Sequence, residues 1–277
     1  MSAPARGNND HMQVLLDDTL ITALLTLPIR EGWVDTERFS RQPGIRASDV
    51  GPENAALLPA GEMSALAGSH AIVPEVAVVC DGVGAIAMRT PVRPDGVEAS
   101  IIHLYDVSRT AELLLRATLR PFFGITASEF VADASAEGAA EAQVVLVEGI
   151  EAMRNPEAGF QEDLCRAWFI LTGLRLVSHV LIVPIASSDD DVATLVRDLR
   201  QLIDTGVERR RDVRMALAAD NDLDRDRLAE VTNRLRWSLE RPDVDSLQML
   251  FARGTWGTTV PRTMPTLRAA GGDTPGR

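Results

Sequence analysis

Two hydroxyl side chains and a guanidinium lie in a row at Ser108, Arg109 and Thr110, between an apolar run at residues 99–105 and an amphipathic run at residues 110–119. The first run is typical of a strand and the second of a helix. A helix start carries free backbone N–H groups and the positive end of the dipole, and an arginine can bind a carboxylate through two parallel hydrogen bonds. The segment therefore predicts a carboxylate-binding site. The alternative is a simple helix cap, in which a hydroxyl satisfies the free amides and Arg109 stays in water.

The basic residues restrict the chemistry further. The chain has no lysine, so its 28 basic residues are all arginine. This excludes a lysine Schiff base, pyridoxal phosphate attached through lysine, and the lysine-containing phosphate loop of nucleotide-binding proteins. The formal net charge of −12 argues against nucleic acid as a partner, because binding phosphates needs a basic surface.

Location and metal binding can also be judged from the sequence. No apolar run reaches the roughly 20 residues that a membrane helix needs, and residues 1–11 are small and polar rather than an apolar export signal. We therefore expect no membrane partner and a cytoplasmic protein. Cys80 and Cys165 are predicted to be two isolated, buried thiols. The four histidines lack the spacing of metal ligands, so no metal site is expected.

Strand-like apolar runs alternate with amphipathic helical runs, which is typical of an α/β fold with a mostly parallel sheet between layers of helices. Strands are expected at residues 14–16, 55–58, 71–79, 83–88, 99–105, 129–132, 144–147 and 176–183. Helices are expected at residues 19–30, 62–66, 110–119, 149–153, 163–172, 189–205, 224–239 and 243–253. Residues 1–11 and 261–277 are expected to be disordered, because they are polar or rich in Pro, Gly and Thr.

Several segments resemble one enzyme family, in the same order and with similar gaps. Residues 56–63 (ALLPAGEM) and 72–77 (IVPEVA) resemble its strand, "SS-x-E-Y" helix and "LLPDLAI" sequence, and residues 108–110 resemble its "TSRTS" helix start. The most specific match is to "DLG-x-x-W-x-x-LTGLP-x-V", carried by Asp163, Leu164, Trp168, residues 171–174 (LTGL) and Val177. Residues 235–239 (LRWSL), with Leu247 and Phe251, resemble its last helices. The family is that of the chorismate dehydratases of the futalosine route to menaquinone, and the likeness covers residues 55–251.

The resemblance implies a two-lobed fold of the type 2 periplasmic-binding-protein kind, with a ligand cleft between the lobes. Residues 12–88 and 179–260 would form lobe 1, and residues 89–178 would form lobe 2. The resemblance also implies a carbon–oxygen lyase that converts chorismate to 3-[(1-carboxyvinyl)oxy]benzoate without a metal or organic cofactor. Loss of water makes the ring aromatic, so such a site mainly has to hold the carboxylates and assist the departure of a proton and hydroxide.

The site that follows from this resemblance has binding and catalytic parts. The substrate-binding candidates are Pro59, Gly84, Ala85, Ser108, Arg109, Thr110, Glu148 and Gly149. Ser178 and His179 are the catalytic candidates, because they lie where the family has apolar residues and a histidine there could act as a general acid or base. The alternative is a hydrogen-bonded histidine in a changed core.

The sequence also departs from the family pattern. It lacks the family's asparagine near the end of the first strand, Pro59 and Ala60 replace a serine pair, and Ala85 replaces another serine. An aspartate of the family falls at Ile150, with Glu148 beside it. Besides the dehydratase, a non-catalytic cytosolic binding protein for a small carboxylate ligand and a scaffold subunit of a true dehydratase therefore stay open. No particular oligomeric state is predicted.

Overall fold

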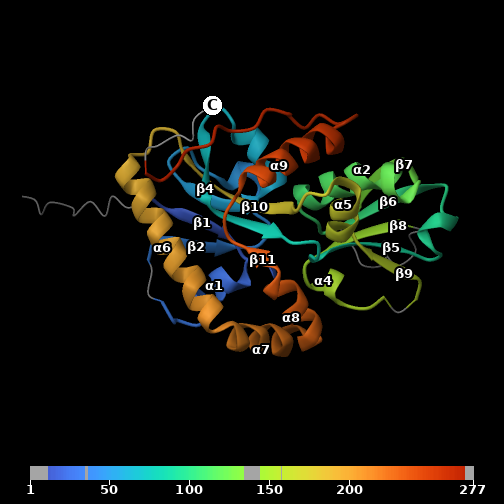
Figure 1. The fold of residues 1–277 in the computed structure, drawn as a ribbon, viewed down its shortest axis with the longest axis horizontal. Coiled ribbons are helices and arrows are strands. Elements are labelled where there is room, and N and C mark those ends of the chain that lie inside the picture. Colours follow the sequence, from blue (N-terminus) through green and yellow to red (C-terminus); the bar gives the residue numbers. More distant parts are fainter. Residues whose placement is uncertain (1–11, 35–36, 134–143, 157, 272–277) are drawn as a thin grey trace, which may run out of the picture.

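The computed structural model describes residues 12–34, 37–133, 144–156 and 158–271. Residues 1–11 and 272–277, for which the sequence predicts disorder, lie outside the described residues. Two lobes lie side by side along the long axis of the molecule, and each is built around one sheet (Figure 1). Within the described ranges, no helix is long and apolar enough to cross a membrane.

The first lobe contains a six-stranded sheet in the order β11-β4-β10-β3-β1-β2. Its strands are β1 (Val14–Asp17), β2 (Phe39–Gln42), β3 (Ala55–Pro59), β4 (His70–Cys80), β10 (Leu176–Pro184) and β11 (Leu235–Arg236). β1 is parallel to β2 and β3, whereas β10 is antiparallel to β3 and β4. The carboxyl ends of β1 and β3 therefore lie at the same edge, where ligand sites of open α/β sheets are usually found.

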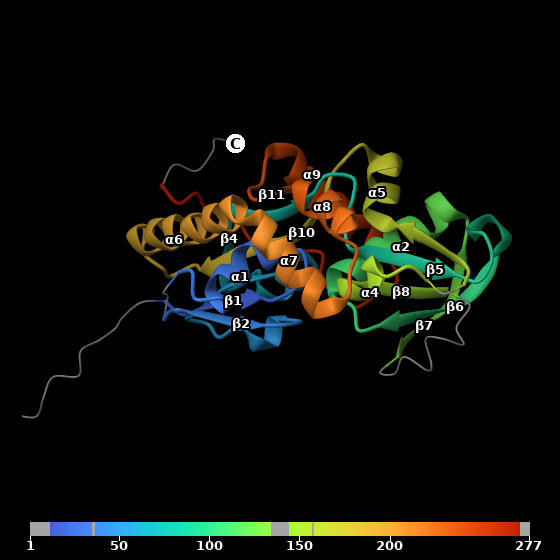
Figure 2. The same ribbon diagram turned by 90° about the horizontal axis from the view of Figure 1, so that it is seen from below.

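Apolar side chains alternate between the two faces of this sheet, because successive residues of a strand point to opposite sides. Ala55 and Leu57 belong to a core that includes the helices on one face (Figure 2). These helices are α1 (Ala23–Arg30), α6 (Asp189–Glu208), α7 (Arg210–Asn221) and α8 (Arg225–Asn233). Ala56 and Leu58 belong to a second core on the other face.

The second lobe contains a five-stranded sheet in the order β7-β6-β8-β5-β9. Its strands are β5 (Ile86–Thr90), β6 (Ala99–Tyr105), β7 (Thr126–Asp133), β8 (Val144–Glu148) and β9 (Phe160–Asp163). Its helices are α2 (Arg109–Phe123), α4 (Ile150–Met153) and α5 (Leu164–Thr172). The described residues also contain three short 3-10 helices, namely η1 (Ala47–Asp49) and η2 (Ala60–Leu66) after β2 and β3, and η3 (Pro94–Gly96) after β5.

The second core joins the lobes. It contains Leu58 and Val180 of the first sheet, Leu113 of α2 and Trp168 of α5. Helix α9 (Arg241–Gly254) packs against α2 across this core, and its Phe251 is fully buried there. The predicted lobe limits at 88/89 and 178/179 fall inside β5 and β10, whereas the chain passes between the two sheets at residues 81–85 and 164–175.

Some expectations differ from the structure near the C-terminus. The helix predicted for residues 224–239 ends with α8 at Asn233, and the next residues form β11, which pairs with Cys80 and Val79 at the edge of β4. The sequence predicts disorder for residues 261–271, but in the structure this segment contacts the first sheet. The backbone of Ile72 accepts a hydrogen bond from the N–H of Arg268 and donates one to the carbonyl of Thr266, so this segment covers an edge of the first sheet.

Candidate functional site

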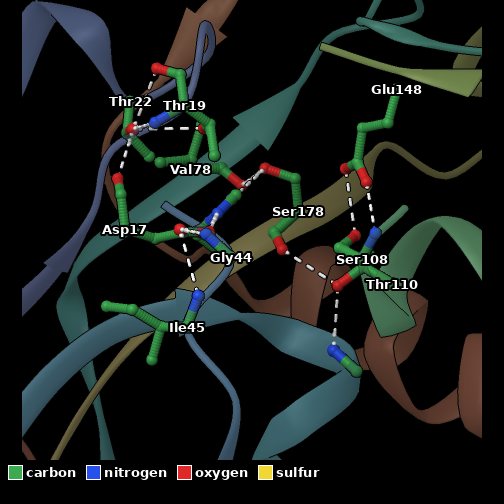
Figure 3. A network of polar contacts seen from close by, with 12 residues as sticks. Asp17, Thr19, Thr22, Gly44, Ile45, Val78, Ser108, Thr110, Glu148 and Ser178 are labelled. Atoms are coloured by element: carbon green, nitrogen blue, oxygen red, sulfur yellow. Dashed lines mark hydrogen bonds and ion pairs between the residues drawn. The ribbon is translucent and has the colours of Figure 1, made fainter. Parts of the chain in front are cut away.

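The side chain of Asp17, at the end of β1, is almost fully buried, with 1% of it exposed. Its Oδ1 accepts hydrogen bonds from the backbone N–H groups of Gly44 and Ile45, at 2.7 and 3.3 Å (Figure 3). Gly44 has a φ of +67°, a left-handed conformation that favours glycine and that turns the chain after β2 toward Asp17. Thr22 donates a hydrogen bond to the carbonyl of Asp17, which fixes the backbone at the same point.

The second oxygen of Asp17 contacts a residue that is 162 positions further along the chain. Its Oδ2 lies 2.9 Å from Nε2 of His179, on β10, and His179 is 2% exposed. The other ring nitrogen, Nδ1, lies 3.1 Å from Oγ of Ser178. The hydroxyl of Ser178 donates in turn to the carbonyl of Val78 on β4, at 3.2 Å. Asp17, His179 and Ser178 therefore form one chain of hydrogen bonds inside the first lobe.

The contacts of this chain indicate which atoms can exchange protons. The carbonyl of Val78 can only accept, so the hydroxyl of Ser178 donates to it and can accept from Nδ1 of His179. Nε2 of His179 and Oδ2 of Asp17 lie close enough to share a proton. The Asp17–His179 pair is therefore arranged to hold a proton and to pass it on.

An irregularity in β10 positions Ser178. Val177 pairs with Val79 and His179 pairs with Val78, so Ser178 is an extra residue in the ladder, as in a β-bulge. Its carbonyl consequently points away from β4 and accepts a hydrogen bond from the Thr110 hydroxyl at the start of α2. The bulge therefore links the catalytic candidates of one lobe to the predicted carboxylate site of the other.

The start of α2 contacts η2 of the first lobe directly. Oγ1 of Thr110 accepts a hydrogen bond from the backbone N–H of Gly61 at 2.9 Å, and Thr110 is 1% exposed. A Cβ atom on Gly61 would lie 2.6 Å from the backbone carbon of Arg109 and from the nitrogen of Thr110. Only a glycine therefore allows η2 to approach the helix this closely.

A carboxylate is bound at this helix start, and it is the chain's own. The backbone N–H of Ser108 donates to Oε2 of Glu148 at 2.6 Å, and the hydroxyl of Ser108 lies 3.0 Å from Oε1 (Figure 3). Oγ of Ser108 also caps α2 by accepting from the N–H of Ala111. Ser108 therefore caps α2 and also binds a carboxylate of the chain itself, and binding of a ligand carboxylate at this place stays a prediction.

Burial raises the pKa of the Glu148 carboxyl group above its ordinary value, although the hydrogen bonds from Ser108 favour the charged form. Two further groups act on it from the first lobe. The charge of His179 lowers this pKa and the charge of Asp17 raises it. Glu148 is therefore electrostatically connected to the Asp17–His179 pair across the boundary between the lobes.

The side chain of Arg109 is paired within α2 in this conformation, and its binding to a ligand stays a prediction. Its guanidinium donates to Oε2 of Glu112 at 2.7 Å, one helical turn away, and 38% of the side chain is exposed. Arg116 contacts the other oxygen of the same carboxylate at 2.9 Å. The arginine thus lies at the helix start but is paired along the surface of α2.

The remaining substrate-binding candidates make backbone contacts that hold the turns and strand ends near the site. Pro59, at the end of β3, lies opposite His179 in the sheet. The N–H of Gly149, which has a φ of +62°, donates to the carbonyl of Ala85 and holds the turn that follows Glu148. Gly84 donates its N–H to Oδ2 of Asp163, the N-cap residue of α5, at 3.0 Å.

Cys80 and Cys165 are buried free thiols, as the sequence predicts, but contrary to the prediction they are not isolated, because they contact one another. A hydrogen bond with Cys80 and burial raise the pKa of the Cys165 thiol. A Cβ atom on Gly84 would overlap with Sγ of Cys165 and lie 3.7 Å from Sγ of Cys80. The two thiols therefore fill the space beside a glycine at the crossing between the lobes.

Asp17 is the residue that sequence reasoning missed. It was visible only as the acid that ends the first apolar run, next to Asp18. One signal was available: Asp17 follows directly on the first predicted strand. The carboxyl ends of parallel strands such as β1 and β3 lie at the same edge of the sheet, where ligand sites are usually found. Among the described residues, no group of three or more His, Cys, Asp and Glu side chains is arranged to hold a metal ion.

The two sheets, the double crossing of the chain and the polar groups between the lobes define a periplasmic-binding-protein-like fold, as the sequence predicts. Protein AF1704 from Archaeoglobus fulgidus is similar at a TM-score of 0.68 and 17% identity, over 90% of this chain and 98% of that one. The aliphatic sulphonate binding protein SsuA from Escherichia coli is similar at a TM-score of 0.60 and 11% identity, over 94% of both chains. The alkanesulfonate-binding protein SsuA from Xanthomonas axonopodis, bound to MOPS, gives a TM-score of 0.58 and 12% identity, over 97% of this chain and 100% of that one.

The family follows from a separate comparison. The model of a family described as "Menaquinone biosynthesis" matches residues 51–255, more than half of the chain, so the chain belongs to this family and has a role in menaquinone biosynthesis. This confirms the resemblance on which the sequence analysis relied. None of the curated proteins matches the chain.

Proposed function

We propose that the chain binds chorismate between its lobes and dehydrates it to 3-[(1-carboxyvinyl)oxy]benzoate in the cytoplasm. The observation that carries the proposal is the convergence of a carboxylate-binding helix start and a proton-holding pair at one place. Ser108 and Thr110 lie on α2, and Thr110 is bonded through the carbonyl of Ser178 to the strand that carries His179. Membership of the menaquinone family supports the choice of substrate.

The proposal assigns a role to each of these residues. Ser108, Arg109 and Thr110 hold a carboxylate of chorismate, and Arg109 turns from Glu112 toward the ligand. The Asp17–His179 pair gives a proton to the departing hydroxyl group, the C–O bond breaks, and water leaves. His179 then takes the ring proton that is lost on aromatisation, which restores the pair and balances the reaction. Ser178 keeps the ring of His179 in its orientation by accepting from Nδ1.

Access requires the lobes to separate, because His179 and Thr110 are both almost fully buried. The contact that has to open is the one between Gly61 and the start of α2. On closing again, the lobes exclude water and strengthen the electrostatic interactions around the ligand.

Mass spectrometry of chorismate after incubation with purified protein tests the proposal. We expect the dehydrated product above a control without protein. His179→Gln should lower kcat by about 100-fold or more, the usual contribution of a general acid or base. Arg109→Ala should mainly raise KM. Asp18→Ala is the matched control, because this acid adjoins Asp17 but pairs with Arg41 near the surface. Chorismate that stays unchanged at high protein concentration would refute the dehydratase.

A non-catalytic binding protein for a small carboxylate is the second candidate, and a specific observation favours it. Glu148 and the side chain of Arg109 already have partners in the chain, so the site is complete without a reaction to perform. This function predicts saturable binding of chorismate or another carboxylate in titration calorimetry, with the ligand recovered unchanged.

A further inference from the structure

Glu148 is bound as a ligand carboxylate would be. Each of its two oxygens has a hydrogen-bond donor of its own, the N–H of Ser108 for Oε2 and the hydroxyl of Ser108 for Oε1, at 2.6 and 3.0 Å. Both donors lie at the start of the 15-residue helix α2, where the dipole favours an anion. The carboxylate comes from a different element, the last residue of β8.

The charges around Glu148 disfavour a second carboxylate beside it. The charged and titratable groups that act on Glu148 are His179 of β10 and Asp17 of β1, and its own charge acts on the thiol of Cys165 in α5. One of these groups, Asp17, is itself a carboxylate. The nearest arginine on α2, Arg109, is paired with Glu112. A ligand carboxylate that joined Glu148 here would therefore add like charge to a partly buried site, which costs free energy.

We propose that Glu148 is a built-in occupant of the anion site at the start of α2, and that the carboxylate of the ligand replaces it there. This inference rests on the proposed function in that it takes a carboxylated ligand to bind between the lobes. Glu148 thereby sets the ligand requirement. A neutral ring compound cannot replace Glu148 at Ser108 and therefore binds weakly. A carboxylated ligand can replace it, because it accepts the same two hydrogen bonds from Ser108. The affinity of the wild-type site is lowered by the work of displacing Glu148.

Acetate tests the occupant without any assumption about chorismate. Glu148→Ala vacates the two donors, so sodium acetate should raise the Tm of this variant more than sodium chloride at equal ionic strength. The rise should be about 3 °C or more at ten times the dissociation constant of acetate. Wild type should show no such difference, and Glu148→Gln, which fills the place with a neutral amide, should lie between the two.

Asp224→Ala is the matched control for a helix start. Asp224 also bonds two backbone N–H groups, of Asp226 and Arg227 at the start of α8, but it is exposed to solvent. Acetate should not stabilise this variant, because water satisfies exposed amides. Equal acetate effects in wild type, Glu148→Ala and Asp224→Ala would overturn the proposal. If Glu148→Ala does not fold, the comparison of Glu148→Gln with wild type decides, and equal responses to acetate overturn the proposal in the same way.

Chorismate titrated into the same variants separates the two proposals. Tighter binding of chorismate by Glu148→Ala than by wild type supports both. An acetate effect without chorismate binding by any variant supports the occupant and refutes the proposed substrate. Chorismate binding that is weaker in Glu148→Ala than in wild type would show that Glu148 holds the ligand rather than competes with it.

Discussion

Three contacts to the carboxyl group of Asp17 compensate for its loss of water on burial. Two backbone N–H groups and the His179 ring contact its carboxylate, and Thr22 fixes its carbonyl. A buried ion pair of this kind contributes little net stability by itself, but removing one partner leaves an uncompensated charge. The pair therefore holds the protons where the proposed reaction uses them, and the fold depends on keeping both partners.

We expect Asp17→Ala to lower the free energy of unfolding by about 3–5 kcal/mol, because the proton-holding ring of His179 then lacks its buried partner. The double variant Asp17→Ala/His179→Ala should lose less than the sum of the single losses. Urea denaturation of the four proteins in the cycle measures this. Asp18→Ala, the half-exposed neighbour, should cost less than about 1 kcal/mol. Additive losses in the cycle would mean that the two residues act independently.

Helices α1 and α6 pack backbone against backbone at Gly206, and this contact lies next to the site. Helix α1 begins directly after Thr22, which holds Asp17. A Cβ atom on Gly206 of α6 would overlap with the carbonyl oxygen of Leu24 in α1. That carbonyl belongs to the backbone, so no side-chain rotation relieves the overlap.

Gly206→Ala should therefore destabilise the protein by about 2–3 kcal/mol, even though alanine favours helix over glycine by roughly 1 kcal/mol. Thermal denaturation measures the change. Gly68→Ala is the control, because the space around its Cβ position is open and its φ is not positive. Equal effects of the two substitutions would show that the α1–α6 approach is looser than the structure indicates.

The sequence predicts the long, buried elements well. The apolar run at 176–183 corresponds to β10, and Gly173 ends α5 with a φ of +73°, as a glycine after a helix predicts. Short edge strands such as β2 and β9 were missed, because four half-exposed residues carry no clear alternation. The site shows the same limit. Ser108 could be singled out from a local pattern and Glu148 from the family resemblance, whereas the pairing of His179 with Asp17 depends on a tertiary contact that no spacing reveals.

In the part of the chain that the structure describes, the two sheets share one large apolar core, and only a small cluster around Val145 and Val147 belongs to the second lobe alone. One core contains side chains of both sheets together with α2, α5 and α9. A second large core lies on the outer face of the first sheet, under α1, α6, α7 and α8. Strands β3 and β10 contribute to both of these cores through alternating residues. Unfolding of one core would therefore expose strands on which the other core packs.

Both lobes should therefore unfold together, and two tryptophans can report on this. Trp168 is fully buried in the shared core, and its Nε1–H donates to Ser246 of α9 at 3.0 Å. Trp33 packs at the outer core, with the Arg209 guanidinium 3.7 Å from its ring centroid. Two variants are needed, one that retains only Trp33 and one that retains only Trp168, with phenylalanine at the other tryptophan positions. In each variant we expect the urea midpoint measured by fluorescence to coincide with the midpoint measured by circular dichroism. A Trp168 transition at lower urea, with Trp33 unchanged, would show that the second lobe unfolds by itself. The opening that the proposed function needs would then be local unfolding rather than movement of two folded lobes.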